Sequence, residues 1–281
     1  SGSITLIGDD GITLGGNLTS TATTDGAISF TGPVTLGANI TIDADAANTD
    51  VNFTSAQTTI NATSAGAQSL TIDTDAGNVS IQGAIGGSAK LSALSIDNAD
   101  GAGTIEVFTI GTTSAVGVEG STLIGNTNTA TLTLDGADYR TTGLQTYTTA
   151  AGDKILVGVD DTAIDFISTD TNISFVGGDL VIKDSADTTI ATQAVGATAS
   201  VGNISFGGAI HGTAGDTTTD LTVNAGTGTV SFQLIDGATT DINDIAVTGS
   251  TITLNKNVNT GTSGTVGLTG NVALDLSLIH I

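Results

Sequence analysis

One short pattern recurs along the chain: an apolar residue, a small polar residue and a second apolar residue. Ile4-Thr5-Leu6, Ile28-Ser29-Phe30 and Leu221-Thr222-Val223 are three copies. Successive side chains of an extended strand point to opposite faces, so both apolar positions of a triplet share one face. The pattern therefore predicts short β-strands with one buried face. No window shows the apolar spacing of three and four residues that a long amphipathic helix requires.

The segments between the triplets consist of residues that favour tight turns. Gly15-Gly16-Asn17 and Asn224-Ala225-Gly226-Thr227-Gly228 are examples. Glycine adopts positive φ without steric cost, and Asn and Asp tolerate it. The spacing between triplets is irregular, from 6 to about 20 residues. This irregularity favours coils with turns of variable length over strict consensus repeats.

The composition limits how thick the hydrophobic core can be. The 281 residues include 7 Phe and 2 Tyr but no Trp, Met or Cys, so the apolar residues are mainly Val, Ile, Leu and Ala. A thick globular core of this size normally contains more bulky side chains. A thin core suits a solenoid, in which each repeat buries its apolar face only against its neighbours. We therefore expect an all-β fold, a β-solenoid, with tandem antiparallel β-sandwich repeats as the alternative.

A longer repeat is superimposed on the triplets. The segments 77–87 and 202–212 are similar or identical at eight of eleven positions. We expect residues 1–275 to form a single repetitive solenoid, with a less regular stretch at 105–183 that contains the only Arg and both Tyr. The last six residues, 276–281, do not continue the pattern and are interpreted as read-through into a sequencing adapter. His280 is therefore not considered as a ligand.

The charge of the chain excludes several classes of partner. The formal net charge is −23, from 28 acidic and 5 scattered basic residues. No basic patch can form, so neither nucleic acid nor an anionic membrane surface is an expected partner. The sequence contains no stretch of about 18 apolar residues, so no transmembrane helix is predicted. The chain begins at Ser1 without Met or a signal segment, so we expect the true N-terminus to lie elsewhere.

Two segments carry a family resemblance. The first is Gly77-Asn78-Val79-Ser80-Ile81-Gln82-Gly83-Ala84-Ile85-Gly86-Gly87, followed by Leu91-Ser92-Ala93-Leu94-Ser95-Ile96. The second is Thr142-Gly143-Leu144-Gln145-Thr146-Tyr147. They resemble the filamentous-haemagglutinin-like and autotransporter-type passenger proteins of bacteria, especially the long β-strand-repeat surface proteins. The resemblance implies a right-handed parallel β-helix that is exported and displayed at the cell surface or released.

Catalytic chemistry finds little support in the sequence. His211 replaces a Gly of the sister repeat, so we interpret it as a surface turn residue. The chain has no Gly-x-Ser-x-Gly elbow, no His-Glu-x-x-His and no phosphate-binding loop. The close carboxylate pairs are Asp43/Asp45, Asp73/Asp75, Asp160/Asp161 and Asp184/Asp187. We expect no enzyme and no catalytic residue. The metal candidates, for calcium, are Asp73, Asp75, Asp160 and Asp161, because Ca²⁺ prefers several oxygen ligands.

Three functions remain as hypotheses. The first is a structural or adhesive rod segment of a large secreted or cell-surface bacterial protein, with surface glycans or proteins and flanking repeats of the same polypeptide as partners. The second is a calcium-dependent coat protein of the S-layer type, built from tandem β-sandwiches. The third is a carbohydrate-active β-helix enzyme. The solenoid hypothesis also makes a structural prediction: Phe206 and Phe232, which lie 26 residues apart, should point inward from adjacent coils and come near contact.

Overall fold

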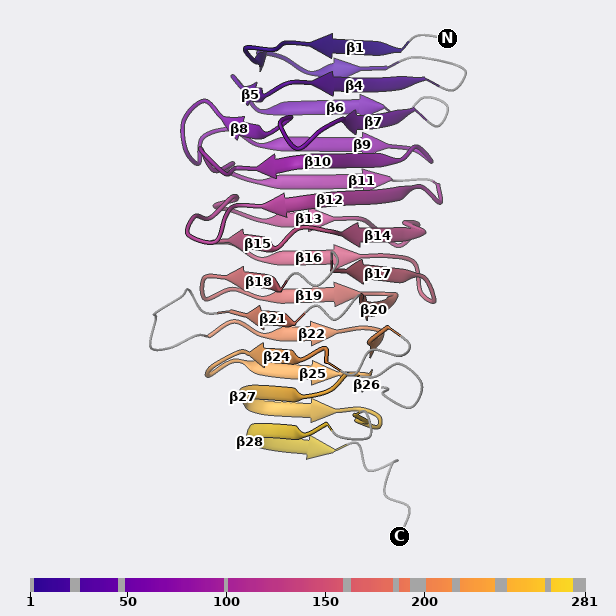
Figure 1. The fold of residues 1–281 in the computed structure, drawn as a ribbon, viewed down its shortest axis with the longest axis vertical. Helices are drawn as coiled ribbons and strands as arrows, with labels where there is room; N and C mark the ends of the chain where they lie inside the picture. The colour runs from indigo at the N-terminus through magenta and orange to yellow at the C-terminus, as the bar shows by residue number, and fades with distance from the viewer. Residues whose placement is uncertain are drawn as a thin grey trace.

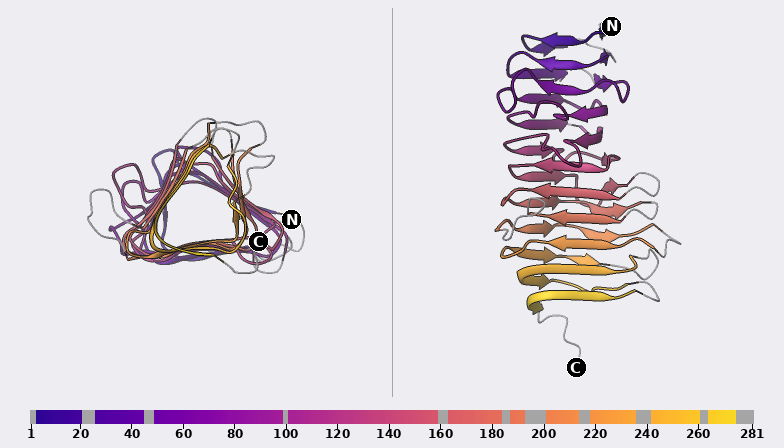
Figure 2. Two further views of the ribbon diagram at one scale, coloured as in Figure 1. Left: turned by 90° about the horizontal axis from the view of Figure 1, so that it is seen from below. Right: turned by 60° about the vertical axis from the view of Figure 1, so that its left-hand side comes forward.

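The chain winds into a stack of parallel coils. The computed structural model describes residues 3–20, 26–44, 49–98, 101–158, 163–183, 187–192, 201–213, 218–235, 242–260 and 264–274. All strand pairings in these residues are parallel, and the same residues contain no helix. Figure 1 shows the coils stacked along the long axis, and the end-on view in Figure 2 shows a triangular cross-section. The prediction of an all-β solenoid is confirmed, and the antiparallel β-sandwich alternative is wrong.

Each side of the triangle is a parallel sheet in which strands from successive coils pair. The first face contains β1 (Ile4–Ile7), β4 (Ala27–Thr31), β7 (Asp50–Phe53), the first parts of β10 (Val79–Ile85) and β12 (Thr104–Ile110), β14 (Thr131–Leu134), β17 (Lys154–Val157), β20 (Asp179–Ile182), β23 (Ala209–His211) and β26 (Leu234–Ile235). The second face contains β2 (Ile12–Leu14), β5 (Val34–Leu36), β8 (Ile60–Ala62), the later parts of β10 and β12, β15 (Asp138–Thr141), β18 (Ile164–Ser168), β21 (Thr188–Ala191), β24 (Leu221–Asn224) and the first parts of β27 (Ile245–Leu254) and β28 (Val266–Leu274). The third face contains β3 (Leu18–Thr19), β6 (Ile40–Ala44), β9 (Leu70–Thr74), β11 (Leu94–Asn98), β13 (Thr122–Ile124), β16 (Gln145–Thr148), β19 (Ile173–Val176), β22 (Ile204–Phe206), β25 (Thr229–Phe232) and the later parts of β27 and β28.

The length of a coil varies because the turns vary while the strands stay paired, with shifts of register between β10 and β12 and between β27 and β28. Paired residues lie 20 positions apart at the shortest, as in Leu254 with Leu274, and 33 at the longest, as in Ile190 with Val223. The predicted variable turns therefore coexist with uninterrupted pairing. The segment 105–183 is covered by strands β12 to β20, the first of which begins at Thr104, and these strands stack on their neighbours as the other strands do. The predicted read-through segment 276–281 lies outside the described residues.

Apolar residues of the triplets fill the interior of the triangle. Both apolar positions of each triplet point inward, as alternation requires, and one continuous core runs through the coils. Phe206 and Phe232 are buried, and their rings stack with centroids 5.0 Å apart. The prediction for this pair is confirmed. Phe175 extends the stack, with its ring centroid 5.4 Å from that of Phe206.

A buried polar network crosses the core at the second resemblance segment. Gln145 is fully buried, and its Nε2 lies 3.0 Å from the carbonyl oxygen of Tyr139 and 2.8 Å from that of Ile167. Tyr147 donates its hydroxyl to Gln145 Oε1 over 2.9 Å. Burial raises the pKa of the Tyr147 hydroxyl well above its usual value. The Gln and Tyr of this segment thus point into the core and link neighbouring coils.

Asn and Asp side chains connect successive coils at the corners of the triangle. Asn78 Oδ1 accepts hydrogen bonds from the backbone N–H and the hydroxyl of Thr104, at 2.9 and 2.8 Å. The N–H of Asn78 in turn donates to Asp50 Oδ1 over 2.7 Å. Asp244 repeats this geometry with Thr265, whose hydroxyl and N–H lower the pKa of the Asp244 carboxyl. These side chains satisfy backbone donors at the start of the next coil, where a turn would otherwise leave them unpaired.

Candidate functional site

The outward faces are mostly Ser, Thr and Asn, so a functional site has to be a local departure from that surface. The described residues contain three recesses that involve charged or aromatic side chains. One surrounds Arg140 on the second face, and one runs along the glycines beside His211. The third lies at a corner beside Phe108.

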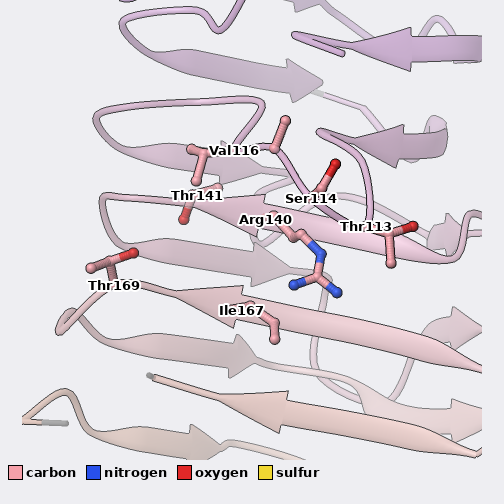
Figure 3. A pocket seen from close by; sticks show the side chains of 8 residues that line it. Thr113, Ser114, Val116, Arg140, Thr141, Ile167 and Thr169 are labelled. Atoms are coloured by element: carbon pink, nitrogen blue, oxygen red, sulfur yellow. The ribbon is translucent and has the colours of Figure 1, made fainter. Parts of the chain in front are cut away.

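The first recess has a volume of about 370 Å³ and contains the only arginine of the chain. Arg140 points outward from β15, and its side chain is only 7 % exposed. Figure 3 shows the guanidinium between the turn that contains Thr113 and strand β18, which carries Ile167. The turn is closed by reciprocal backbone hydrogen bonds between Thr112 and Ala115, at 2.9 and 3.1 Å.

Two carboxylates contact Arg140, one from its own strand and one from the next coil. Nε donates to Asp138 Oδ1 over 2.7 Å, and Nη2 contacts Asp165 Oδ2. Thr113 donates its hydroxyl to the second oxygen of Asp138 over 3.3 Å. The cluster therefore carries two negative charges and one positive charge in a partly buried setting. Its geometry ties β15 to β18, and removal of the arginine would leave two carboxylates uncompensated.

Glycines form the floor of the second recess, which has a volume of about 470 Å³. Gly177, Gly207 and Gly208 line it together with His211 and Lys256. A Cβ added at Gly208 would lie 2.2 Å from the carbonyl oxygen of Gly178, so a side chain at this position would not fit between the coils.

His211 and Asp179 form a pair of polar side chains in this recess. His211 Nε2 lies 3.5 Å from Asp179 Oδ2, and Asp179 Oδ1 accepts the N–H of Ala209 over 2.8 Å. His211 is the last residue of strand β23, so the interpretation of it as a turn residue is wrong. The physical reason is that the pairing of β23 with β20 extends to His211, opposite Val181, while its side chain stays on the outward face.

The calcium candidates are only partly covered by the described residues. Asp73 lies in β9, stacked in register between Asp43 of β6 and Asp97 of β11. Asp75 lies in the turn that follows β9. Asp160 and Asp161 lie outside the described residues, as do Asp45 and Asp184. Within the described residues, no three His, Cys, Asp or Glu side chains come close enough to hold a metal ion. Asp43, Asp73 and Asp97 thus form a ladder of like charges on the third face, one carboxylate per coil.

Sequence reasoning missed Arg140 and Phe108 as surface features. The alternation of inward and outward residues along a strand contains an indirect signal for each of them. Val107-Phe108-Thr109 breaks the apolar–polar–apolar pattern, so one of the two adjacent apolar residues has to face outward. In Tyr139-Arg140-Thr141 the strand buries Tyr139 and Thr141, which places Arg140 on the outer face. Asp138 is a partner of Arg140 on the same strand, but Asp165 comes from the next coil, and a sequence without known coil lengths cannot place it.

The fold and these recesses define a repeat protein of the parallel β-solenoid class. No protein-family model, no curated protein and no solved structure matches this chain. Within the residues that the structure describes, no helix is long and apolar enough to cross a membrane.

Proposed function

We propose that this chain is a structural rod segment of a large secreted or cell-surface bacterial repeat protein, which holds an adhesive surface away from its point of attachment. The observation that supports it most is the unbroken parallel pairing from β1 to β28. The resemblance to filamentous-haemagglutinin-like and autotransporter-type passengers points to the same class.

A solenoid is suited to spacing because its length grows with the number of coils and its cross-section does not. The second face alone makes ten successive pairings from β2 to β28. With about 4.8 Å between paired strands, these coils extend roughly 48 Å. Each coil contacts only its neighbours, so more coils would lengthen the rod without a new core. The stacked rings at Phe30–Phe53 and Phe175–Phe206–Phe232 add contacts along the axis.

An extracellular location and an adhesive role are the further parts of the proposal. The chain has no cysteine and a net charge of −23, which suits a large bacterial surface protein that relies on neither disulfides nor a basic ligand patch. Surface glycans or proteins are the proposed partners, and flanking repeats of the same polypeptide would stack on the ends. Localisation of the full gene product by antibody labelling of intact cells tests this part, and a purely intracellular signal would contradict it.

Two experiments test the rod and the adhesion separately. Single-molecule stretching should unfold the chain in steps of one or a few coils, with 20–33 residues per coil as the pairing gives. A single cooperative step without substructure would contradict a mechanical stack of coils. The folded chain should also bind specific members of an array of neutral glycans and surface proteins. Uniform absence of binding would remove the adhesive role and leave the rod intact.

The parallel fold limits the coat-protein hypothesis and the enzyme hypothesis. The coat-protein hypothesis required tandem β-sandwiches, and parallel pairing excludes that architecture. Its calcium component is tested by melting curves with Ca²⁺ and Mg²⁺. The carbohydrate-active enzyme would have to use outward carboxylates such as Asp73, and a screen of neutral glycans for cleavage tests it. We propose that no cleavage occurs, because the five basic residues are scattered and cannot stabilise the charge that develops during such a reaction.

A further inference from the structure

Phe108 is the one aromatic residue of the chain that reaches the surface. It is 40 % exposed, whereas the other eight aromatic side chains are buried in the core. Its ring lines a recess of about 320 Å³ together with Ala56, Gln82, Glu106 and Asp135. These residues come from four successive coils, so the recess runs along the corner between the first and second faces for roughly 14 Å.

The backbone that carries Phe108 is fixed from inside the core. The register between β10 and β12 shifts at this corner, where Gln82 and Gly83 of one coil oppose Phe108 alone in the next. The hydroxyl of Tyr139 lies 2.8 Å from the carbonyl oxygens of both Val107 and Phe108, and it accepts the N–H of Gly136 over 2.9 Å.

Gly136 lets the next coil approach Phe108 closely. A Cβ at residue 136 would lie 1.4 Å from the Phe108 carbonyl oxygen, so no other residue fits there without a shift of the backbone. The backbone of Phe108 is therefore held in place by the fold, which lowers the cost of ordering this residue when a ligand binds.

Two carboxylates accompany the ring. Glu106 lies two residues before Phe108 on the same strand, and its Oε2 accepts the hydroxyl of Ser80 over 2.9 Å. Asp135 follows β14, which pairs with β12 in the next coil. Both carboxylates line the recess, and both raise the pKa of the buried Tyr139 hydroxyl, after the larger effect of burial. No lysine or arginine lines this recess.

We propose that this recess binds an organic cation, with an ammonium or guanidinium group placed against the Phe108 ring and hydrogen-bonded to Glu106 and Asp135. The face of an aromatic ring attracts cations through its quadrupole, and the two carboxylates accept the N–H donors. The net charge of −23 attracts a cation to the molecule and repels an anion. Gln82 supplies an amide at the edge of the recess. This inference concerns a ligand and does not depend on the rod or on the extracellular location.

The test uses the whole chain labelled with ¹³C on its phenylalanine rings, titrated with N-acetylarginine amide at low salt. Phe108 is the expected responder, and the six buried Phe rings are internal references. Phe108→Leu assigns its signal. N-acetylcitrulline amide is the neutral comparison because it keeps the shape of arginine and part of its N–H donors but not the charge. Spermidine distinguishes a free polyamine from an arginine side chain of a partner protein, and binding of either supports the site.

Glu106→Gln provides the site variant and Glu119→Gln its matched control, since these are the only two glutamates of the chain and Glu119 pairs with Lys90 elsewhere. We expect Glu106→Gln to weaken binding of N-acetylarginine amide at least three-fold and Glu119→Gln to leave it within 1.5-fold. Phe108→Leu, followed through backbone amides near Asp135, should weaken it roughly two- to five-fold. Equal shifts with the citrulline compound or with maltose would overturn the proposal. An equal loss of affinity in Glu106→Gln and Glu119→Gln would also overturn the proposal, because that result indicates a diffuse attraction to the acidic surface.

Discussion

Replacement of Phe206 by Ala is the most informative perturbation of the core. The Phe206 ring stacks between Phe175 and Phe232, with centroid distances of 5.4 and 5.0 Å and interplanar angles of 1° and 6°. Phe206 is only 3 % exposed. Loss of a buried aromatic removes its transfer free energy and leaves a cavity, which together cost roughly 3–5 kcal/mol. Loss of two stacked contacts places the expected cost in the upper half of that range.

Two control variants separate core packing from other effects. Phe108→Ala removes the same atoms from an exposed position and should cost about 1 kcal/mol. Ser205→Ala removes an outward hydroxyl that donates to Ser174 over 3.0 Å, a part-buried hydrogen bond worth about 0.5–1 kcal/mol.

Urea unfolding followed by circular dichroism measures all three variants. Hydrogen exchange near β22 checks whether the loss is local, because coils can unfold separately in a solenoid. If Phe206→Ala and Phe108→Ala differed by less than about 1 kcal/mol, the claim that Phe206 packs in a continuous core would be refuted.

Three further predictions concern charge. The melting temperature should rise from low to moderate NaCl, because salt screens the repulsion among the charges of a chain with a net charge of −23. A flat or falling melting temperature would contradict this. A further rise with millimolar Ca²⁺ but not Mg²⁺ would support a calcium site. Asp73→Asn should raise the free energy of unfolding by about 1 kcal/mol by relieving repulsion from Asp43 and Asp97, whereas the turn variant Asp75→Asn should change it less. The pKa of Tyr139 and of Tyr147 is raised in the fold, so the stability that depends on their neutral hydroxyls is complete below the unfolded value of 10.0 and is lost as the pH rises above it. Absorbance at alkaline pH should therefore show phenolate only as the chain unfolds, and phenolate in a fully folded chain would oppose the buried assignment.

The fold could be predicted from the sequence because its main determinant is local. Alternation in Ile204-Ser205-Phe206 and Val230-Ser231-Phe232 fixes which side chains point inward, and a spacing of 26 residues places the two Phe in adjacent coils. Buried polar residues were harder to predict. Gln145 occupies an inward position that alternation assigns to an apolar residue, and its partners at Tyr139 and Ile167 lie in other strands.

The candidate sites depend on coil lengths, which vary with the turns. Asp73 was expected to act with Asp75, two positions along the chain, but its in-register neighbours are Asp43 and Asp97, 30 and 24 positions away. Arg140 likewise meets Asp165 because one coil here takes 27 residues, as in the pairing of Tyr139 with Phe166. Turn lengths are set by many small preferences and not by a single pattern, so contacts between coils required the structure.

Distances between spin labels on one outward column test the central claim most directly. Ser29, Thr133, Leu156 and Val181 belong to one column of the first face, and the chain has no native cysteine to interfere with labelling. From Ser29, the other three lie four, five and six coils away, so double electron–electron resonance should give backbone separations of roughly 19, 24 and 29 Å, increasing by about 4.8 Å per coil. Separations that failed to increase in equal steps from Thr133 to Leu156 to Val181 would contradict the parallel solenoid.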